Sequence, residues 1–146
     1  MTAADVHFRQ MRAEDISAVL ALWEQAGLDN RPTGRDAPEA LTEQLGVMGR
    51  HFWLAELDGR IVGAVLGTHD SRKGWINRLA VHPEFRRRGL AAVLVGRAEK
   101  SLAEDGIEIF AALVDSGNES SCRVFESTGY KEYPVHYFRK PLRPSV

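Results

Sequence analysis

Apolar and polar residues alternate along residues 6–11, which predicts a short β-strand near the start of the chain. The next apolar residues follow the helical period instead, and they predict an amphipathic helix with a stripe of Ile16, Val19, Leu20 and Trp23. Gly27 is expected to end this helix, and a loop rich in Gly, Pro, Asp and Asn follows it. A second helix is expected over residues 39–48.

The middle of the chain has the pattern of a β-meander. Two β-rich segments flank Asp58-Gly59, and this dipeptide is the strongest short signal for a hairpin. Lys73 and Gly74 turn the chain again, and the segment WINRLAVHP predicts a further strand that Pro83 closes. We therefore expect three neighbouring strands that pair antiparallel.

The last third predicts two more helices and two more strands. The first helix ends near Gly106, and its apolar stripe consists of Leu90, Val93, Leu94, Ala98 and Leu102. The segment IEIFAALV then predicts a strand with one face made of Ile107, Ile109, Ala111 and Leu113. A short helix is expected over residues 120–127. The segment YKEYPVHYFRK predicts a last strand, in which Pro134 bends the chain or marks an edge.

The order of these elements predicts the fold class. Strand, helix and strand between residues 75 and 114 form a βαβ unit, so these two strands should be parallel with a right-handed crossover. The other strands are expected to be antiparallel, which predicts an α/β fold with one mixed sheet and helices on its faces. We expect a single domain over residues 1–146, because the length suits one core and no linker or repeat divides the chain.

Composition narrows the functional classes. Hydrophobic residues make up 44% of the chain, charged residues 27%, and the net charge is −1. This balance disfavours nucleic-acid binding, which needs a basic face and aromatic platforms for the bases. The single Cys122 and the absence of an apolar leader or membrane-length segment predict a cytoplasmic protein that does not bind membranes.

Three arginines and a glycine, Arg86-Arg87-Arg88-Gly89, lie between a predicted strand and a predicted helix. Free N–H groups and the positive end of the helix dipole meet at such a place, and Gly89 lets a ligand approach the backbone closely. One interpretation is a phosphate site, and the other is a solvated charged turn that ends in a glycine. Neither G-x-x-x-x-G-K-[ST] nor G-x-G-x-x-G after a strand is present.

The segment Arg86-Arg87-Arg88-Gly89-Leu90-Ala91 resembles the [QR]-x-x-G-x-[GA] signature of the GNAT superfamily of N-acetyltransferases. INRLAVHPEFRRRGLA is similar to that family's strand, bulge and pyrophosphate loop, and NESSCRVFESTGY is similar to its later helix. The order of elements also agrees, so the resemblance covers nearly the whole chain. It implies transfer of an acetyl group from acetyl-CoA to a primary amine, in a small molecule or a protein.

The resemblance also implies roles for particular residues. The pyrophosphate of acetyl-CoA would be held by backbone N–H groups at Arg87, Arg88, Gly89, Leu90 and Ala91, with Arg86 at the first position of the signature. The pantetheine would lie along Leu79, Ala80 and Val81, and the Val81 N–H would point at the thioester carbonyl. Asn118 and Phe125, both on the later helix segment, would contact the cofactor.

The chain departs from the family at the residue that supplies a proton. The family has a tyrosine seven residues after the Asn, and this chain has Phe125 there, which cannot donate one. The departing thiolate could instead take its proton from water, Cys122, Ser121, Tyr133 or Tyr137. The substitution leaves a second hypothesis open, a catalytically weak acyl-CoA-binding module that acts as a sensor or scaffold.

The general base is open among four residues. An amine of pKa near 10.4 must lose a proton before it attacks, and the candidates are Glu24, Glu56, His69, His82 or a relay of water. We assign the catalytic roles to Val81, Glu24 and Tyr133. By the same resemblance, residues 24–39 and the last strand would line the acceptor side, and the last strands could pair in a homodimer. We expect no metal site.

Overall fold

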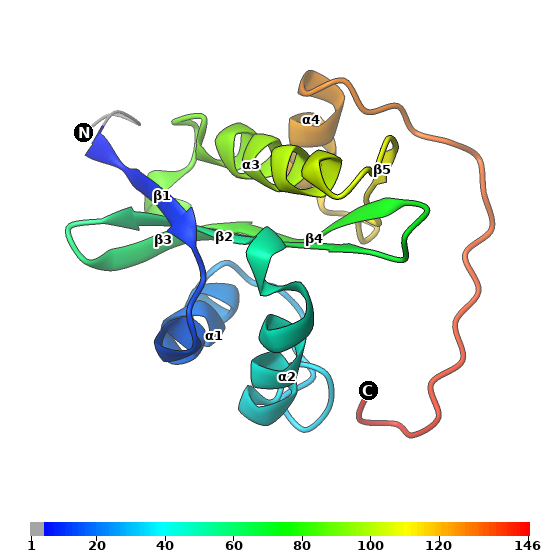
Figure 1. The fold of residues 1–146 in the computed structure, drawn as a ribbon, viewed down its shortest axis with the longest axis horizontal. Helices are drawn as coiled ribbons and strands as arrows, with labels where there is room; N and C mark the ends of the chain where they lie inside the picture. The colour runs from blue at the N-terminus through cyan, green and yellow to red at the C-terminus, as the bar shows by residue number, and fades with distance from the viewer. Residues whose placement is uncertain (1–4) are drawn as a thin grey trace.

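One five-stranded sheet forms the centre of the computed structural model, which describes residues 5–146 (Figure 1). Its strands are β1 (His7–Gln10), β2 (Phe52–Leu57), β3 (Arg60–His69), β4 (Gly74–Val81) and β5 (Phe110–Ala111), and they lie in this order across the sheet. Neighbours pair antiparallel except β4 and β5, which are parallel. The mixed sheet predicted from the sequence is therefore confirmed.

Helices cover both faces of the sheet (Figure 1). On one face lie α1 (Ile16–Gln25) and α2 (Pro38–Met48), and on the other lie α3 (Leu90–Glu104) and α4 (Glu119–Ser127). Short 3₁₀ turns occupy Ala13–Asp15, Gly49–His51 and Pro83–Phe85. Each face has its own apolar core: Trp23 and Phe52 are fully buried in one, and Leu94 and Leu102 in the other. The apolar stripe of α1 packs into the first core and that of α3 into the second, so each face of the sheet has a core of its own.

A bulge interrupts the pairing of β3 with β4. Ala64 pairs with Ala80 and Leu66 pairs with Asn77, so two residues of β4, Arg78 and Leu79, lie opposite the single residue between them on β3. Arg78 has a φ of 53°, a left-handed conformation that is costly outside glycine. The strands β4 and β5 pair only at Gly74 with Phe110 and at Trp75 with Ala111. The part of β4 beyond the bulge therefore has no strand beside it on this edge. The sheet is therefore open between the later part of β4 and the chain that follows β5.

The last strand predicted from the sequence is wrong for this structure. Residues 130–140 contain no strand, and residues 131–144 are all exposed. The segment leaves the end of α4 and arches away from the body, as Figure 1 shows for the orange and red trace. Pro134 lacks an N–H, and β5 offers a regular strand of only two residues as a partner. The strand predicted over IEIFAALV is shortened to these same two residues, Phe110 and Ala111.

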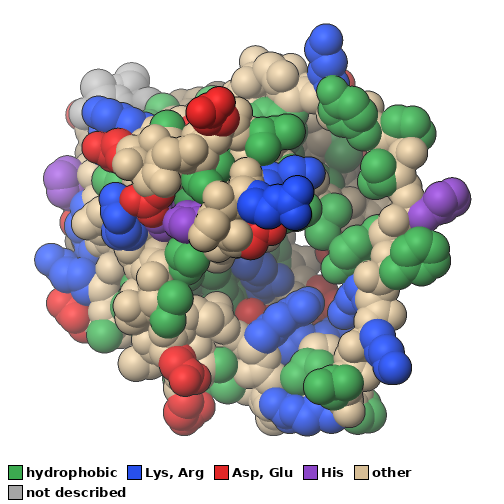
Figure 2. Space-filling model, turned by 45° about the vertical axis from the view of Figure 1, so that its right-hand side comes forward, with side chains coloured by type: hydrophobic (Ala, Val, Ile, Leu, Met, Phe, Trp, Pro, Cys, Tyr) green, Lys and Arg blue, Asp and Glu red, His purple; other side chains and the backbone are tan. Residues whose placement is uncertain are grey.

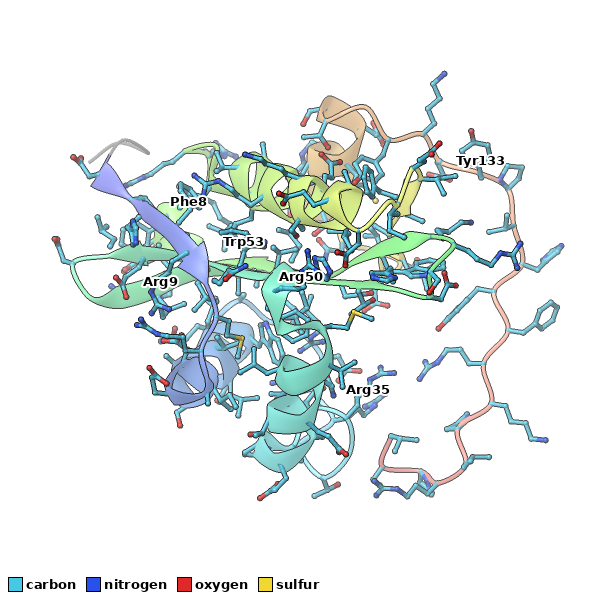
Figure 3. The ribbon with its side chains drawn as sticks, in the orientation of Figure 1. Phe8, Arg9, Arg35, Arg50, Trp53 and Tyr133 are labelled. Atoms are coloured by element: carbon cyan, nitrogen blue, oxygen red, sulfur yellow. The ribbon has the colours of Figure 1, made fainter. Side chains whose placement is uncertain are left out.

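A partly buried ion cluster joins β1 to the turn at Ala13–Asp15 and to β2. Arg9 of β1 donates hydrogen bonds of 2.8 Å to both carboxylate oxygens of Asp15 and one of 3.0 Å to Glu56 of β2 (Figure 3). The hydrogen bonds from Arg9, with a further one from the Arg12 N–H, hold the pKa of Asp15 below its ordinary value of 3.8. The stabilisation from this pair is therefore present above pH 3.8 and is lost as the pH falls through the lowered pKa.

Replacing Asp15 by Asn should lower the free energy of unfolding by about 2 kcal/mol at pH 7, because the Arg9 guanidinium would keep its burial but lose its bidentate partner. Urea unfolding at pH 7 and at stepwise lower pH checks this. The difference between Asp15→Asn and the original protein should shrink below pH 3.8. Glu14→Gln is the matched control, since Glu14 is next in sequence and its ion pair with Arg12 is largely exposed. An equal loss in both variants at pH 7 would contradict the assignment.

Candidate active site

The N-terminus of α3 has the backbone geometry of an anion site. Gly89 is its N-cap with a φ of 77°, and no side chain caps the helix. Arg87, two residues earlier, is also left-handed with a φ of 64°. These turns direct the loop into the helix and leave the first N–H groups of α3, from Leu90 onward, without a side-chain acceptor. An anion placed there would meet free donors and the positive end of the helix dipole.

The three arginine side chains do different things. Arg86 folds back, and its guanidinium donates to the backbone carbonyls of Val81 at 3.2 Å and Ala26 at 3.4 Å. The Arg88 guanidinium lies 5.2 Å from the centre of the Phe85 ring, and all three arginines are exposed. Arg86 therefore braces the loop against β4 and the end of α1, while the other two remain beside the helix start.

A pocket of about 460 Å³ fills the opening between β4 and the segment after β5. One wall is β4, with Ile76, Arg78 and Leu79, and the opposite wall is the chain from Leu113 to Ser121. The end of α1 and the following residues, Ala26 to Asp29, close a third side. Arg86 also lines this pocket, so the pocket and the helix N-terminus border the same loop. We name it the slot.

The Val81 N–H faces the open side of β4. The following residue, His82, donates its N–H to Val62 of β3 at 2.8 Å. Because successive N–H groups of an extended strand point to opposite sides, the N–H of Val81 points away from β3. At this level β5 has no pairing with β4, so the Val81 N–H faces the open edge of β4 rather than a neighbouring strand.

Arg78 is a site residue that the sequence analysis missed. Its guanidinium stacks 4.2 Å over the ring of Trp23, and it donates to Asp29 O at 2.7 Å and to Asn30 Oδ1. Burial lowers the pKa of Arg78, although an arginine keeps its charge at neutral pH. Among the described residues its Nε has no hydrogen-bond partner. The role of Arg78 depends on the bulge in β4, and the alternation of apolar and polar residues does not show where a bulge lies.

Asn118 and Phe125 both line the slot. Asn118 is the N-cap of α4, where its Oδ1 accepts from the Ser121 N–H at 3.2 Å. Phe125 is 7% exposed and packs edge-to-face on Tyr130, with ring centres 5.0 Å apart. The Tyr130 hydroxyl donates to Glu99 of α3 at 2.6 Å, and burial raises its pKa, so this tyrosine holds its proton. Ser121 lines the slot and bears a hydroxyl.

Tyr133 lies far from the slot in this chain. It is 72% exposed, on the segment that stands off the body (Figure 3). Tyr137 is on the same segment and is 62% exposed. Neither tyrosine lines the slot of its own chain.

Three of the four candidate bases are held in other interactions. Glu56 is paired with Arg9, and His69 lies 3.1 Å from the Asp105 carboxylate at the opposite end of the sheet. His82 is 8% exposed and lies within 3.1 Å of donors on Glu84 and Arg60.

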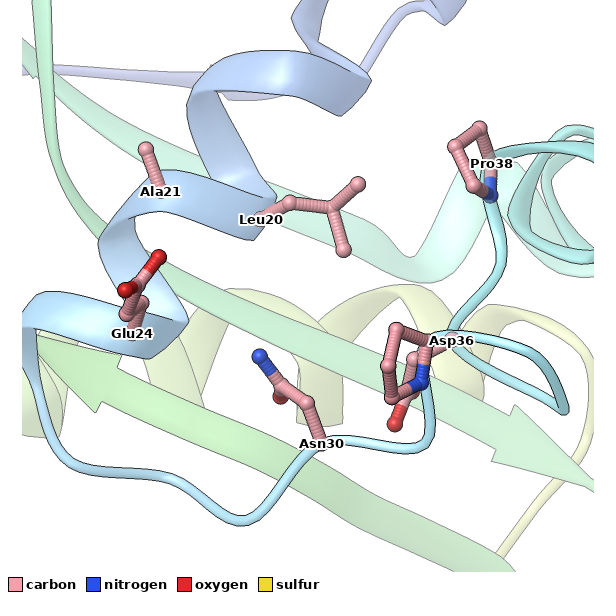
Figure 4. A pocket seen from close by; sticks show the side chains of 7 residues that line it. Leu20, Ala21, Glu24, Asn30, Asp36 and Pro38 are labelled. Atoms are coloured by element: carbon pink, nitrogen blue, oxygen red, sulfur yellow. The ribbon is translucent and has the colours of Figure 1, made fainter. Parts of the chain in front are cut away.

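Glu24 is the remaining candidate. It is exposed and lines a second pocket of about 340 Å³ between α1 and the loop to α2 (Figure 4). Leu20, Ala21 and Pro38 give this pocket apolar walls, and Asp36 adds a second carboxylate. Asp36 is itself 5% exposed and accepts from the Arg31 N–H at 2.6 Å. Asn30, which also lines this pocket, is bound by Arg78 from the slot side.

A cluster of His51, His69 and Asp105 places three ligand-type atoms within 4.8 Å of one another. Nε2 of His51 lies 2.8 Å and Nε2 of His69 lies 3.1 Å from the same Asp105 oxygen, and Arg50 contacts the other oxygen at 2.6 Å. Hydrogen bonds within the chain thus satisfy these atoms, and the adjacent guanidinium disfavours a metal cation. The cluster lies at the C-terminal end of α3, away from Gly89, and we assign no metal to it.

Within residues 5–146 no helix combines the length and the apolar character needed to cross a bilayer. The pocket-lining elements all belong to the sheet, the helices that pack on it and the loops that join them.

Comparison of the amino-acid sequence with known proteins identifies a family and related proteins. The model of the acetyltransferase (GNAT) family matches residues 16–130. The chain is 32% identical over 127 residues to acetyltransferase plu1384 of Photorhabdus laumondii, covering 87% of each protein. It is 34% identical over 126 residues to acetyltransferase ECA0875 of Pectobacterium atrosepticum, covering 86% of this chain and 88% of that one.

Solved structures share the fold at lower identity. Ard1 from Thermoplasma volcanium superimposes with a TM-score of 0.78 at 17% identity, over 89% of this chain and 85% of that one. The PaiA N-acetyltransferase of Thermoplasma acidophilum, in complex with coenzyme A, gives 0.78 at 17% identity over 90% and 92%. The aminoglycoside acetyltransferase AAC(6')-Iy, with a bisubstrate analogue, gives 0.75 at 22% identity over 93% and 98%. The family match, the relatives and the shared fold agree: this chain belongs to the GNAT acetyltransferase family.

Proposed function

We propose that this protein is a cytoplasmic, single-domain N-acetyltransferase that moves an acetyl group from acetyl-CoA to a primary amine. The observation that carries the proposal is the uncapped N-terminus of α3 at Gly89 beside an open slot along β4. The backbone from Arg87 to Ala91 would bind the pyrophosphate. Leu79, Ala80 and Val81 would bind the pantetheine as a strand binds a strand.

The reaction is a direct transfer. The amine nitrogen attacks the thioester carbonyl carbon, and the tetrahedral intermediate collapses with cleavage of the C–S bond. The Val81 N–H, directed away from β3, supports a role in binding the oxyanion. The amine loses one proton and the departing thiolate takes one up, so the reaction needs a base on the acceptor side and a donor near the sulfur.

Glu24 is the base we propose, directly or through water. It is the candidate that borders a pocket, and its carboxylate has no hydrogen bond to another residue within 5–146. For the thiolate, Phe125 supplies no proton, whereas Ser121 and water can reach the slot. Tyr133 does not line the slot, so it could donate this proton only after residues 131–142 moved toward the slot.

The acceptor we propose is a small cationic amine that also carries an oxygen. The carboxylates of Glu24 and Asp36 suit the ammonium group, and the guanidinium of Arg78, which lines the slot, suits the oxygen. AAC(6')-Iy, one of the structural neighbours, is described in complex with a bisubstrate analogue that joins CoA to monomethyl-acetylneamine.

Calorimetric titration of the full chain tests this function. Acetyl-CoA and dephospho-acetyl-CoA should bind with micromolar Kd, because both have the pyrophosphate and the pantetheine arm, whereas NAD, which has a pyrophosphate but no pantetheine arm, should not bind. A screen of small amines for CoA release then separates the two hypotheses. Binding with turnover on any amine supports the enzyme, and tight binding without turnover on any of them supports the acyl-CoA sensor. Folded protein that binds no acetyl-CoA would overturn both.

A further inference from the structure

Residues 143–146 pack on the loop that joins α1 to α2. Arg143 donates a hydrogen bond of 3.3 Å to Thr33 O and another of 2.6 Å to the Ser145 hydroxyl. Figure 1 shows this part of the chain beside the loop that leads into α2. We name these four residues the latch.

Gly34 allows the latch to approach the loop closely. It is buried, although its two neighbours in the chain are exposed. A Cβ added at Gly34 would clash with the Ser145 carbonyl oxygen and would lie 3.0 Å from the Val146 Cα. The backbone of the latch therefore packs directly on the backbone of the loop, and only glycine leaves room for this contact.

The residues that the latch contacts lie between two residues of the acceptor-side pocket. Pro32 and Asp36 are on either side of them in the chain, and both line the pocket of Glu24. The N–H groups of Gly34 and Asp36 donate to Arg31 O at 2.9 and 3.1 Å, so this part of the loop is one hydrogen-bonded turn. A contact that holds the outside of the turn therefore also fixes the pocket residues on it.

The start of the same loop is held from the slot. Arg78 donates to Asp29 O at 2.7 Å and to Asn30 Oδ1. Two distant parts of the chain thus fix the loop, Arg78 at its start and the latch further along. The Arg78 contacts lie between the pocket and the slot, whereas no residue of the latch lines the slot.

The latch can detach without disturbing the rest of the fold. It is joined to α4 by residues 131–142, which are all exposed and whose backbone makes one hydrogen bond to another backbone group, from the Val135 N–H to Tyr133 O. Figure 2 shows an open gap between this segment and the body. No residue of 131–146 belongs to either apolar core. Little of the free energy of folding therefore depends on the latch.

We infer that the latch positions the acceptor-side loop, so that Pro32 and Asp36 are held in place for the amine while residues 143–146 lie on Gly34. When the latch detaches, the turn loosens and the pocket loses its fixed walls. The contact itself is independent of the proposed function, whereas its effect on the amine rests on that function. Because the latch does not line the slot, its loss should weaken use of the amine and leave acetyl-CoA binding unchanged.

Hydrogen exchange followed by mass spectrometry tests the contact. In a chain that lacks residues 143–146, a peptide spanning residues 29–37 should exchange about tenfold faster, because the turn is no longer held. Gly34→Ala in the full chain should have the same effect, since its methyl group displaces the latch. The φ of Gly34 lies outside the left-handed region, so alanine brings no backbone strain there.

Gly46→Ala is the matched control for the added methyl group. Gly46 lies on α2, and a Cβ added there has no atom within 4 Å, so this variant should exchange as the original protein does. Unchanged exchange of the 29–37 peptide in the shortened chain would overturn the inference. This readout needs neither acetyl-CoA nor an amine, so it does not depend on the proposed function.

Steady-state kinetics with the best amine tests the positioning role. The shortened chain and Gly34→Ala should each raise KM for the amine about tenfold, with kcat and the Kd for acetyl-CoA within about twofold of the original values. Gly34→Ala in the shortened chain should raise KM no further, because its methyl group then has nothing to displace. Additive effects, or faster loop exchange with an unchanged KM, would overturn the inference. Failure of the original protein to bind acetyl-CoA concerns the proposed function instead.

Discussion

Gly89→Asp is expected to weaken acetyl-CoA binding by about 1000-fold. The substitution puts a carboxylate at the N-cap of α3, where the pyrophosphate is proposed to lie, and like charges about 4 Å apart at a protein surface cost about 4 kcal/mol. Gly89 also has a φ of 77°, so any side chain adds about 1 kcal/mol of backbone strain. There is open space around a Cβ at this position, so the fold itself should survive. Calorimetric titration measures the Kd, and circular dichroism verifies the folded state.

Gly106→Asp is the control for strain and charge together. Gly106 follows the other end of α3, has a φ of 89°, and a Cβ added there would also have no neighbouring atom within 4 Å. It should lose a similar amount of stability but bind acetyl-CoA as the original protein does. If both variants bind equally well, the phosphate assignment fails. If both lose binding equally, the effect comes from the helix as a whole and not from its N-terminus.

The backbone conformation of the loop at Gly89 could be predicted from the sequence because it is determined locally. A glycine between a strand end and a helix start fixes both the left-handed turn and the free N–H groups, and Gly89 has both. The hairpin at Asp58-Gly59 follows from the same kind of local rule, with φ of 49° and 77°. The helical stripes were correct in most positions, because the apolar period decides which face is buried. Leu20 and Val93, however, are only partly buried, and the fully buried Leu22 and Val95 lie outside the predicted stripes.

The parts that sequence reasoning missed depend on contacts between distant segments. Arg78 reads as one polar residue in a strand, and its role follows from a bulge opposite β3 and from Trp23, 55 positions earlier in the chain. The pairing of Glu56 with Arg9, of His69 with Asp105 and of His82 with its neighbours removed three of the four candidate bases only once the fold was known. The last strand was predicted from alternation, which shows that a segment can form a strand and not whether an edge is available to it.

Arg78→Ala is expected to lower kcat/KM for an amine acceptor by about 100-fold while changing the Kd for acetyl-CoA by less than about threefold. The guanidinium joins the β4 bulge to Asp29 and Asn30, which separate the slot from the pocket of Glu24. Without it, Asp29 O and Asn30 lose a charged donor and Trp23 loses its stacked cation, which together are worth about 3 kcal/mol. The loop proposed to bind the pyrophosphate, Arg87 to Ala91, lies beyond Val81 in the chain, and its conformation should not change.

Two further variants decide whether Arg78 helps to position the amine acceptor or only stabilises the fold. Arg97→Ala removes another arginine that lies 5.6 Å from a tryptophan ring, that of Trp53, on the opposite face of the sheet, and it should leave kcat/KM near its original value. Arg78→Lys keeps the charge but not the two-pronged donor geometry, so it should recover only part of the loss. Steady-state kinetics with the best amine, together with thermal melting, separates the cases. A fall in kcat/KM that follows the melting temperature across all three variants would mean that Arg78 stabilises the fold and has no separate part in positioning the acceptor.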